Sequence, residues 1–166
     1  GVFWVTGISG SGKSTFSIYL KNELEKNGYL TVILDGDDMR QIFSKEQKYT
    51  QKDRLSLAYK YSNLAKIINR NNINVIISTI SLFHEIHEFN RTHLNNYIEI
   101  FLNRDIEDIK KDDVKSVYKK RENIVGIDIN AEYPENPDYI FKNVKEEDYP
   151  KLSESIVSKF QGQQAL

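Results

Sequence analysis

A glycine-rich loop near the amino terminus constrains this chain more than any other feature. Residues 7–14 read Gly-Ile-Ser-Gly-Ser-Gly-Lys-Ser. They match in full the G-x-x-x-x-G-K-[ST] pattern, in which backbone N–H groups surround the phosphates of a nucleoside triphosphate. A buried-strand run over 2–6 precedes the loop, and helical apolar spacing follows it over 15–27. The alternative, a chance glycine turn before a helix, does not explain a full match with the correct flanks.

Each residue type in the loop suits a phosphate site. Glycines permit a positive φ and let the backbone approach an anion without a Cβ clash. Lys13 is placed to neutralise the β- and γ-phosphates, and the Ser14 hydroxyl can bind Mg²⁺, while the next helix directs its positive dipole end at the triphosphate. The motif therefore predicts ATP and Mg²⁺ as cofactors, bound by Gly7, Ser9, Gly10, Ser11, Gly12, Lys13, Ser14 and Thr15.

The order of apolar runs predicts a three-layer α/β/α fold with a mostly parallel sheet of about five strands. Continuous Val, Ile and Leu runs alternate with helical patterns, as expected when helices cover both faces of a sheet. We expect strands over 2–6, 31–34, 75–79, 98–102 and 139–144, and helices from 13 and over 51–70, 82–95 and 148–161. A charge-dense stretch leads us to expect a helical lid over about 105–134, although a solvated surface helix fits its composition as well.

Composition limits the partners and the compartment. The chain has 166 residues, a net charge of −1 and no cysteine. We expect one domain over 1–166, a cytoplasmic location, and neither nucleic acid nor membrane as a partner. Gly1 already belongs to the first strand and no methionine precedes it, so we expect that a further segment precedes it in the natural protein.

Two carboxylates and an arginine follow the second strand. Ligands bind beyond the carboxyl ends of parallel strands, which would place this group opposite the phosphate loop. Asp35 could hold Mg²⁺, Asp37 could accept a proton from an attacking hydroxyl, and Arg40 could bind an anionic part of the acceptor. The alternative for Asp-Gly-Asp is a turn whose side chains bind local N–H groups. No base-reading motif of a regulatory GTPase is present, and the third strand ends Ile-Ser-Thr without the aspartate usual in motor or transporter ATPases.

Several motifs in order resemble the adenosine 5′-phosphosulfate (APS) kinase family. They are Phe3–Gly10, Leu34–Arg40, Tyr49–Arg54, Ile80-Ser81, Lys115–Lys120, Gly126–Asp128 and Tyr133–Pro137. The resemblance implies transfer of the γ-phosphoryl group of ATP to the 3′-hydroxyl of a small nucleotide acceptor, and a homodimer. It also implies Asp37 as the base, with Lys13, and acceptor contacts from Asp37, Arg40, Tyr49, Arg54, Ile80, Ser81, Lys115 and Ile124.

The departures from the family gather on the acceptor side. The family's Asn-Ile-Arg-Arg stands here as Leu57-Ala58-Tyr59-Lys60, and its second stacking phenylalanine is replaced near Ile124. Leu82 takes the place of a proline. A smaller, pyrimidine base is therefore expected, and the chain looks like the branch that phosphorylates cytidine diphosphoramidate for capsular polysaccharide. The alternatives are APS itself, in sulfate assimilation, and an ATP-binding module without turnover.

Three histidines fall on the predicted helix over 82–95, at positions 84, 87 and 93. Their spacing of three and six offers no fourth ligand, so a surface or partly buried helix is favoured over a metal site.

Overall fold

The computed structural model describes residues 1–43, 50–111, 125 and 130–164, and its centre is a five-stranded parallel sheet. The strand order is β2-β3-β1-β4-β5, so the chain crosses over the sheet between neighbours in space. The strands are β1 (Val2–Thr6), β2 (Thr31–Asp35), β3 (Asn74–Thr79), β4 (Tyr97–Asn103) and β5 (Tyr139–Lys142). The expected parallel sheet of about five strands is confirmed.

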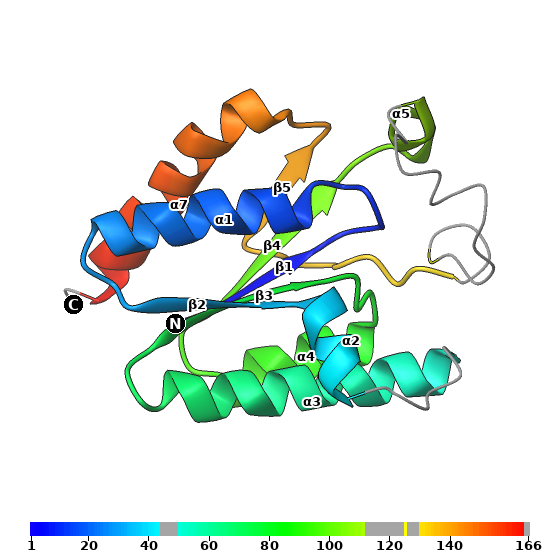
Figure 1. Ribbon diagram of the computed structural model, residues 1–166, viewed down its shortest axis with the longest axis horizontal. Coiled ribbons are helices and arrows are strands. Elements are labelled where there is room, and N and C mark those ends of the chain that lie inside the picture. Colours follow the sequence, from blue (N-terminus) through cyan, green and yellow to red (C-terminus); the bar gives the residue numbers. More distant parts are fainter. Residues whose placement is uncertain (44–49, 112–124, 126–129, 165–166) are drawn as a thin grey trace.

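Helices cover both faces of the sheet, as Figure 1 shows. One layer holds α1 and α7, and the other holds α3 and α4 with α2 at its end. The helices are α1 (Lys13–Lys26), α2 (Gly36–Phe43), α3 (Gln51–Asn69), α4 (His84–His93), α5 (Ile106–Lys111) and α7 (Tyr149–Gln164), and a short 3₁₀ turn spans Glu146–Asp148. The three-layer α/β/α fold predicted from the apolar runs is therefore present.

Alternate residues of the central strands supply two separate cores. Phe3 and Val5 of β1 pack with α1 and α7, whereas Val2 and Trp4 pack with α3 and α4. All four side chains are fully buried, which explains why the strand reads as a continuous apolar run rather than an alternating one.

The carboxyl ends of three neighbouring strands meet at one edge of the sheet. Thr6 of β1 is in register with Thr79 of β3, and Asp35 of β2 is in register with Ser78. The loop before α1, the helix α2 itself and the turn before α4 all start from this edge, which is where α/β proteins bind their ligands.

Two elements differ from the sequence expectation. The helix α2 was not expected, because Asp-Gly-Asp after a strand is typical of a turn. The next difference is at α4, which begins at His84 rather than at Leu82, because Phe83 is extended with φ −135°. Within the described residues, none of the helices combines the length and the apolar character needed to cross a bilayer.

Candidate active site

The backbone of the glycine-rich loop takes conformations that side chains would obstruct. Gly12 has φ +92°, and a Cβ built on it would lie 2.2 Å from the Tyr149 hydroxyl. A Cβ on Gly7 would lie 2.5 Å from the Leu102 carbonyl oxygen. Glycine at these two positions is thus required both by space and, at Gly12, by the left-handed backbone. Gly10 has a positive φ as well, at +78°.

Lys13 begins α1 and turns back over the loop. Its Nζ donates hydrogen bonds to the Ile8 carbonyl at 2.7 Å and to the Ser11 hydroxyl at 3.5 Å. Burial lowers the pKa of Lys13 to about 8, against the opposing attraction of Asp35, while Arg40 adds to the lowering. A desolvated ammonium group aimed into the loop gains most from an anion, so the arrangement suits phosphate.

Ser14 and Asp35 are brought together from α1 and the end of β2. The Ser14 hydroxyl donates to Asp35 Oδ2 at 2.7 Å, and the second oxygen, Oδ1, accepts from the backbone N–H of Asp37 at 2.9 Å. A hydroxyl and a carboxylate at a solvent-accessible place are the hard oxygen ligands that Mg²⁺ takes, together with phosphate oxygens and water. The donor chemistry therefore fits Mg²⁺ bound with ATP.

Asp37 and Arg40 lie one turn apart on α2 and form an ion pair. The Asp37 side chain is 78% exposed, whereas that of Arg40 is 29% exposed. Gly36 holds this helix against the end of β3, since a Cβ there would lie 3.2 Å from the Ser78 carbonyl and 3.6 Å from Arg40 Nη1. Asp37 and Arg40 thus lie at the same edge of the sheet as the start of the glycine-rich loop.

The turn that joins β3 to α4 carries Ser81 in a rare backbone conformation. Its φ is +20°, a region that residues with a Cβ seldom adopt, and such positions persist only where surrounding contacts fix them. Thr6 Oγ1 donates to the Ile80 carbonyl at 2.6 Å, and the hydroxyls of Thr79 and Ser81 are 2.8 Å apart. Ser81 is therefore tied to the ends of β1 and β3.

The remaining expected acceptor residues are placed only in part. Arg54 lies in the first turn of α3, which a capping box between Thr50 and Asp53 begins. Tyr49, Lys115 and Ile124 lie outside the described residues, as does most of the expected lid over 105–134. Of that stretch, α5 is a helix as expected.

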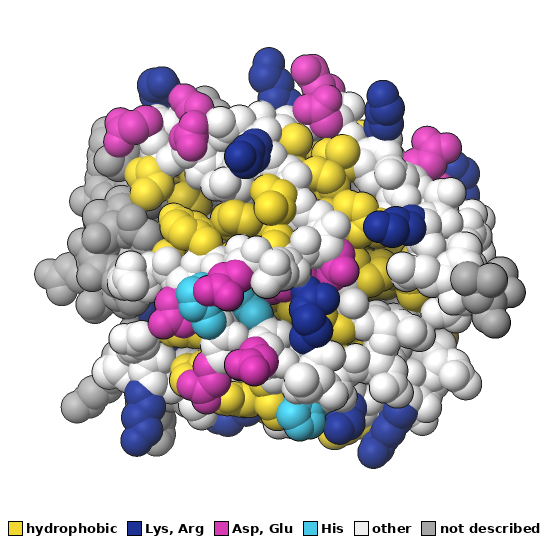
Figure 2. All heavy atoms as spheres, turned by 180° about the vertical axis from the view of Figure 1, so that it is seen from behind, with side chains coloured by type: hydrophobic (Ala, Val, Ile, Leu, Met, Phe, Trp, Pro, Cys, Tyr) yellow, Lys and Arg dark blue, Asp and Glu magenta, His cyan; other side chains and the backbone are white. Residues whose placement is uncertain are grey.

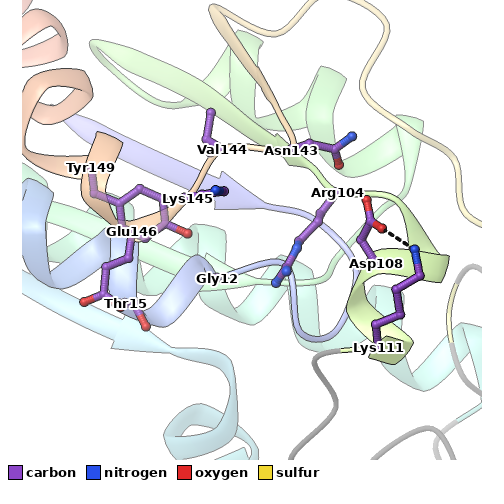
Figure 3. Close-up of a pocket in the computed structure, with 10 residues that line it drawn as sticks. All are labelled: Gly12, Thr15, Arg104, Asp108, Lys111, Asn143, Val144, Lys145, Glu146 and Tyr149. Carbon is purple, nitrogen blue, oxygen red and sulfur yellow. Dashed lines mark hydrogen bonds and ion pairs between the residues drawn. The ribbon is translucent and has the colours of Figure 1, made fainter.

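A cavity of about 520 Å³ opens beside the glycine-rich loop. Figure 3 shows the residues that line it, which come from the start of α1, from the segment after β4 and from α5, and from the segment after β5 up to the start of α7. They are Gly12, Thr15, Arg104, Asp108, Lys111, Asn143, Val144, Lys145, Glu146 and Tyr149. Its size, together with a lining that combines Val144 and Tyr149 with cations, carboxylates and an amide, suits the nucleoside part of a nucleotide whose phosphates lie in the loop.

The sequence analysis missed most of these lining residues, although a signal was available. Arg104 follows β4 and Asn143 follows β5, so both stand at the carboxyl ends of predicted parallel strands. Arg104 Nη1 donates to the Gly10 carbonyl at 3.3 Å. The Asp105 backbone N–H donates to Asn143 Oδ1, and Asn143 Nδ2 donates to Asp105 Oδ2, both at 2.9 Å, so Asn143 of the lining is held in place from the segment after β4.

Comparisons with known proteins agree with this geometry. The family model for adenylylsulphate kinase matches residues 1–142. The cytidine diphosphoramidate kinase of Campylobacter jejuni is 34% identical over 163 residues, which cover 95% of each chain. An adenylyl-sulfate kinase of Rippkaea orientalis is 31% identical, covering 95% of this chain and 88% of its own. The Mycobacterium tuberculosis APS kinase CysC, solved with AMPPNP and APS, shares the fold with a TM-score of 0.86 at 23% identity, over 95% of both chains.

Proposed function

This chain belongs to the adenylylsulphate kinase family and is an ATP-dependent nucleotide kinase, and from that premise we propose that its acceptor is cytidine diphosphoramidate, phosphorylated on the 3′-hydroxyl. The step would contribute to phosphoramidate groups on a capsular polysaccharide. The identities to a cytidine diphosphoramidate kinase and to an adenylyl-sulfate kinase, 34% and 31%, are too close to choose the acceptor, so the choice depends on the acceptor-side residues.

The observation that carries the proposal is the burial of Leu57. This leucine stands where the family has an asparagine that makes a polar contact to the acceptor. Leu57 is 7% exposed and packs in the core that contains Met39 of α2. Two positions on, the Tyr59 hydroxyl donates to Glu85 of α4 at 2.5 Å. These positions are thus engaged in packing and in a helix-to-helix contact, which supports an acceptor other than APS.

In the proposed mechanism, positioning and charge stabilisation supply most of the acceleration. The loop N–H groups and Lys13 hold the triphosphate. Asp37 orients the acceptor's 3′-hydroxyl, and it accepts the hydroxyl proton as the hydroxyl oxygen attacks the γ-phosphorus. The bond from that phosphorus to the β-phosphate oxygen breaks, and ADP leaves. Arg40, which pairs with Asp37, would bind an acceptor phosphate.

Magnesium enters the proposal through Ser14 and Asp35, which would hold it beside the phosphates. When bound, the ion neutralises charge on the β- and γ-phosphates. The 2.7 Å contact between the Ser14 hydroxyl and Asp35 keeps both ligands in place on separate elements.

A direct kinetic comparison tests the acceptor. Purified protein with Mg·ATP is assayed for ADP release with cytidine diphosphoramidate, with cytidine diphosphate and with APS. We expect a higher kcat/KM for the cytidine nucleotides. A preference for APS of about tenfold, which is about 1.4 kcal/mol, would refute the pyrimidine acceptor and leave an APS kinase. ATP binding without ADP release in the presence of any of these nucleotides would favour the binding module.

The homodimer and the single domain are also proposals, taken from the family resemblance and from chain length. Light scattering of the purified chain at several concentrations tests the first, and a single cooperative unfolding transition supports the second.

A further inference from the structure

A group of buried polar side chains lies behind the Ser81 turn and takes no part in the proposed chemistry. Figure 2 shows histidine, acidic and basic side chains gathered in the middle of the face seen from behind. Two of the group are almost inaccessible, since His87 of α4 is 7% exposed and Glu99 of β4 is 2% exposed. An ionisable pair buried this deeply in a small domain calls for a physical reason.

The hydrogen bonds of His87 define which of its nitrogens carries a proton. Nε2 lies 3.0 Å from the Ser81 carbonyl oxygen, which can only accept, so Nε2 must donate. The other nitrogen, Nδ1, lies 3.4 Å from Oε1 of Glu99. Both of these atoms are buried, and within the described part of the chain neither has a hydrogen-bond partner that meets ordinary geometry.

Two unprotonated atoms facing each other at this distance would repel through their lone pairs. One proton between Nδ1 and Oε1 removes the repulsion, whether it sits on the imidazole or on the carboxyl group. The second carboxylate oxygen, Oε2, accepts from Arg91 at 2.9 Å, which fixes the rotation of the carboxyl group and keeps Oε1 aimed at His87. Arg91, Glu99 and His87 therefore follow one another toward the Ser81 backbone, with hydrogen bonds at both ends and a 3.4 Å approach between His87 and Glu99 in the middle.

We propose that His87 is a positioning residue for the acceptor site, which holds the Ser81 turn through its Nε2–H while sharing one proton with Glu99. This inference rests on the proposed function, in which Ser81 contacts the acceptor. The turn needs such support, because Ser81 is one of the non-glycine residues with positive φ and its carbonyl also accepts from the Phe83 N–H at 3.1 Å.

The electrostatic surroundings agree with a proton held on the carboxyl side of the pair rather than on the imidazole. Burial lowers the pKa of His87 to about 4 and raises the pKa of Glu99, although Arg91 opposes the latter shift. The titratable and charged groups around the pair come from α4, β4 and the segment before β5: His84, Arg91, Tyr97, Glu132 and Asp138. Glu132 also holds the turn from outside, accepting from the His84 N–H at 2.7 Å.

Substitutions at His87 distinguish a role in positioning the Ser81 turn from a role in packing alone, through the KM values for the acceptor and for ATP. His87→Phe keeps a planar ring and removes both nitrogens, and we expect the acceptor KM to rise about tenfold while the ATP KM stays within about twofold. His87→Gln places an amide N–H where Nε2 stood, and it should restore the acceptor KM to within about threefold of the parent. His93→Gln is the matched control, since it makes the same change on an exposed residue of α4.

The shared proton has its own test in pH profiles and in NMR. In the parent protein the acceptor KM should rise once the pair loses its proton on the alkaline side, whereas Glu99→Gln, which donates an N–H permanently to Nδ1, should give a KM independent of pH. Nitrogen-15 NMR of histidine-labelled protein should show His87 with Nε2 protonated, assigned by comparison with variants of the other two histidines.

Three results would overturn the inference. They are a His87 protonated on Nδ1 alone, equal effects of His87→Phe on both substrates, and no recovery in His87→Gln. Failure of the parent protein to phosphorylate any nucleotide acceptor would instead refute the proposed function, and the NMR measurement would still decide the proton position.

Discussion

Gly12→Ala is expected to damage the nucleotide site through one defined collision. The added Cβ would lie 2.2 Å from the Tyr149 hydroxyl oxygen but 3.4 Å from the ring carbon that carries it. Tyr149 cannot swing away easily, because it is 4% exposed and its ring packs edge-on against Phe16 at 5.3 Å. The collision and the left-handed backbone of residue 12 therefore both oppose the alanine.

The two costs can be estimated separately. A residue with a Cβ in the left-handed region costs about 1–2 kcal/mol, and overpacking a rigid site costs about 1–3 kcal/mol. We expect Gly12→Ala to lower the free energy of unfolding by about 2–5 kcal/mol, the sum of these terms. In a Tyr149→Phe background the oxygen is gone, and the cost should fall to the backbone term of about 1–2 kcal/mol.

Gly28 supplies a matched control for the backbone term. It has φ +82°, close to that of Gly12, and a Cβ there would meet nothing within 4 Å. Urea unfolding of Gly28→Ala should therefore give the left-handed cost alone. The reasoning is refuted if Gly12→Ala costs no more than Gly28→Ala, or if the coupling between positions 12 and 149 is below about 0.5 kcal/mol in a double-mutant cycle.

Three further predictions concern charge. Lys13, whose pKa burial lowers to about 8, must be protonated to bind phosphate, so above that pH the affinity for ATP should fall about tenfold per unit, as measured by calorimetric titration. Asp37→Asn should lower kcat by about 10²–10⁴-fold and leave ATP binding within about twofold; turnover retained within a few-fold would exclude Asp37 as the base. In the parent protein two opposite contributions meet between pH 4.5 and 6.5, because native Glu99, whose pKa burial raises, keeps a proton that unfolded Glu99 loses, while native His87 lacks one that unfolded His87 binds; the free energy of unfolding should therefore change little with pH in that range. Glu99→Gln removes the Glu99 contribution, so the free energy of unfolding should fall from pH 6.5 toward about 4, because unfolded histidine binds a proton that native His87 does not; denaturant titrations across pH would contradict the pair if both proteins gave the same slope.

The phosphate half of the site could be predicted from sequence because its residues are contiguous. One motif supplies the loop from Gly7 to Ser14, and its conformation follows from glycines whose φ values are positive. The parallel sheet was predictable for a related reason, since strands buried on both faces give continuous apolar runs. Both signals are local in the sequence.

The region after β2 shows how two interpretations of one motif can hold together. Asp-Gly-Asp suggested either a ligand for magnesium or a turn that binds its own backbone. Asp35 uses Oδ1 for the Asp37 N–H, as the turn predicts, and presents Oδ2 to Ser14. The helix α2 escaped prediction because it opens with Gly-Asp-Asp, which is typical of a turn, and because Met39 is the one buried side chain among residues 36–43.

The acceptor half could not be predicted in the same way, because its geometry depends on partners far apart in the chain. The Ile80 carbonyl is held by Thr6, 74 residues away, and the start of α4 by Glu132, 48 residues away. No local pattern predicts such contacts, nor the burial of Glu99 in a largely apolar strand. The cavity beside the loop could not be predicted for the same reason, since its Arg104 donates to the Gly10 carbonyl, 94 residues earlier in the chain.

The glycine-rich loop and the Ser81 turn depend on different residues, so the acceptor can change within the family while the ATP site stays the same. The loop depends on its own glycines and on Tyr149, whereas the Ser81 turn depends on Thr6, His87 and the segment around Glu132. Substitutions behind the turn can therefore shift it without altering the phosphate contacts. We therefore expect that exchange of the residues at 57–60 for the family's Asn-Ile-Arg-Arg changes the acceptor preference only when the Ser81 turn can move together with the exchanged residues. In a Glu99→Gln background, which holds the turn, the same exchange should change that preference less.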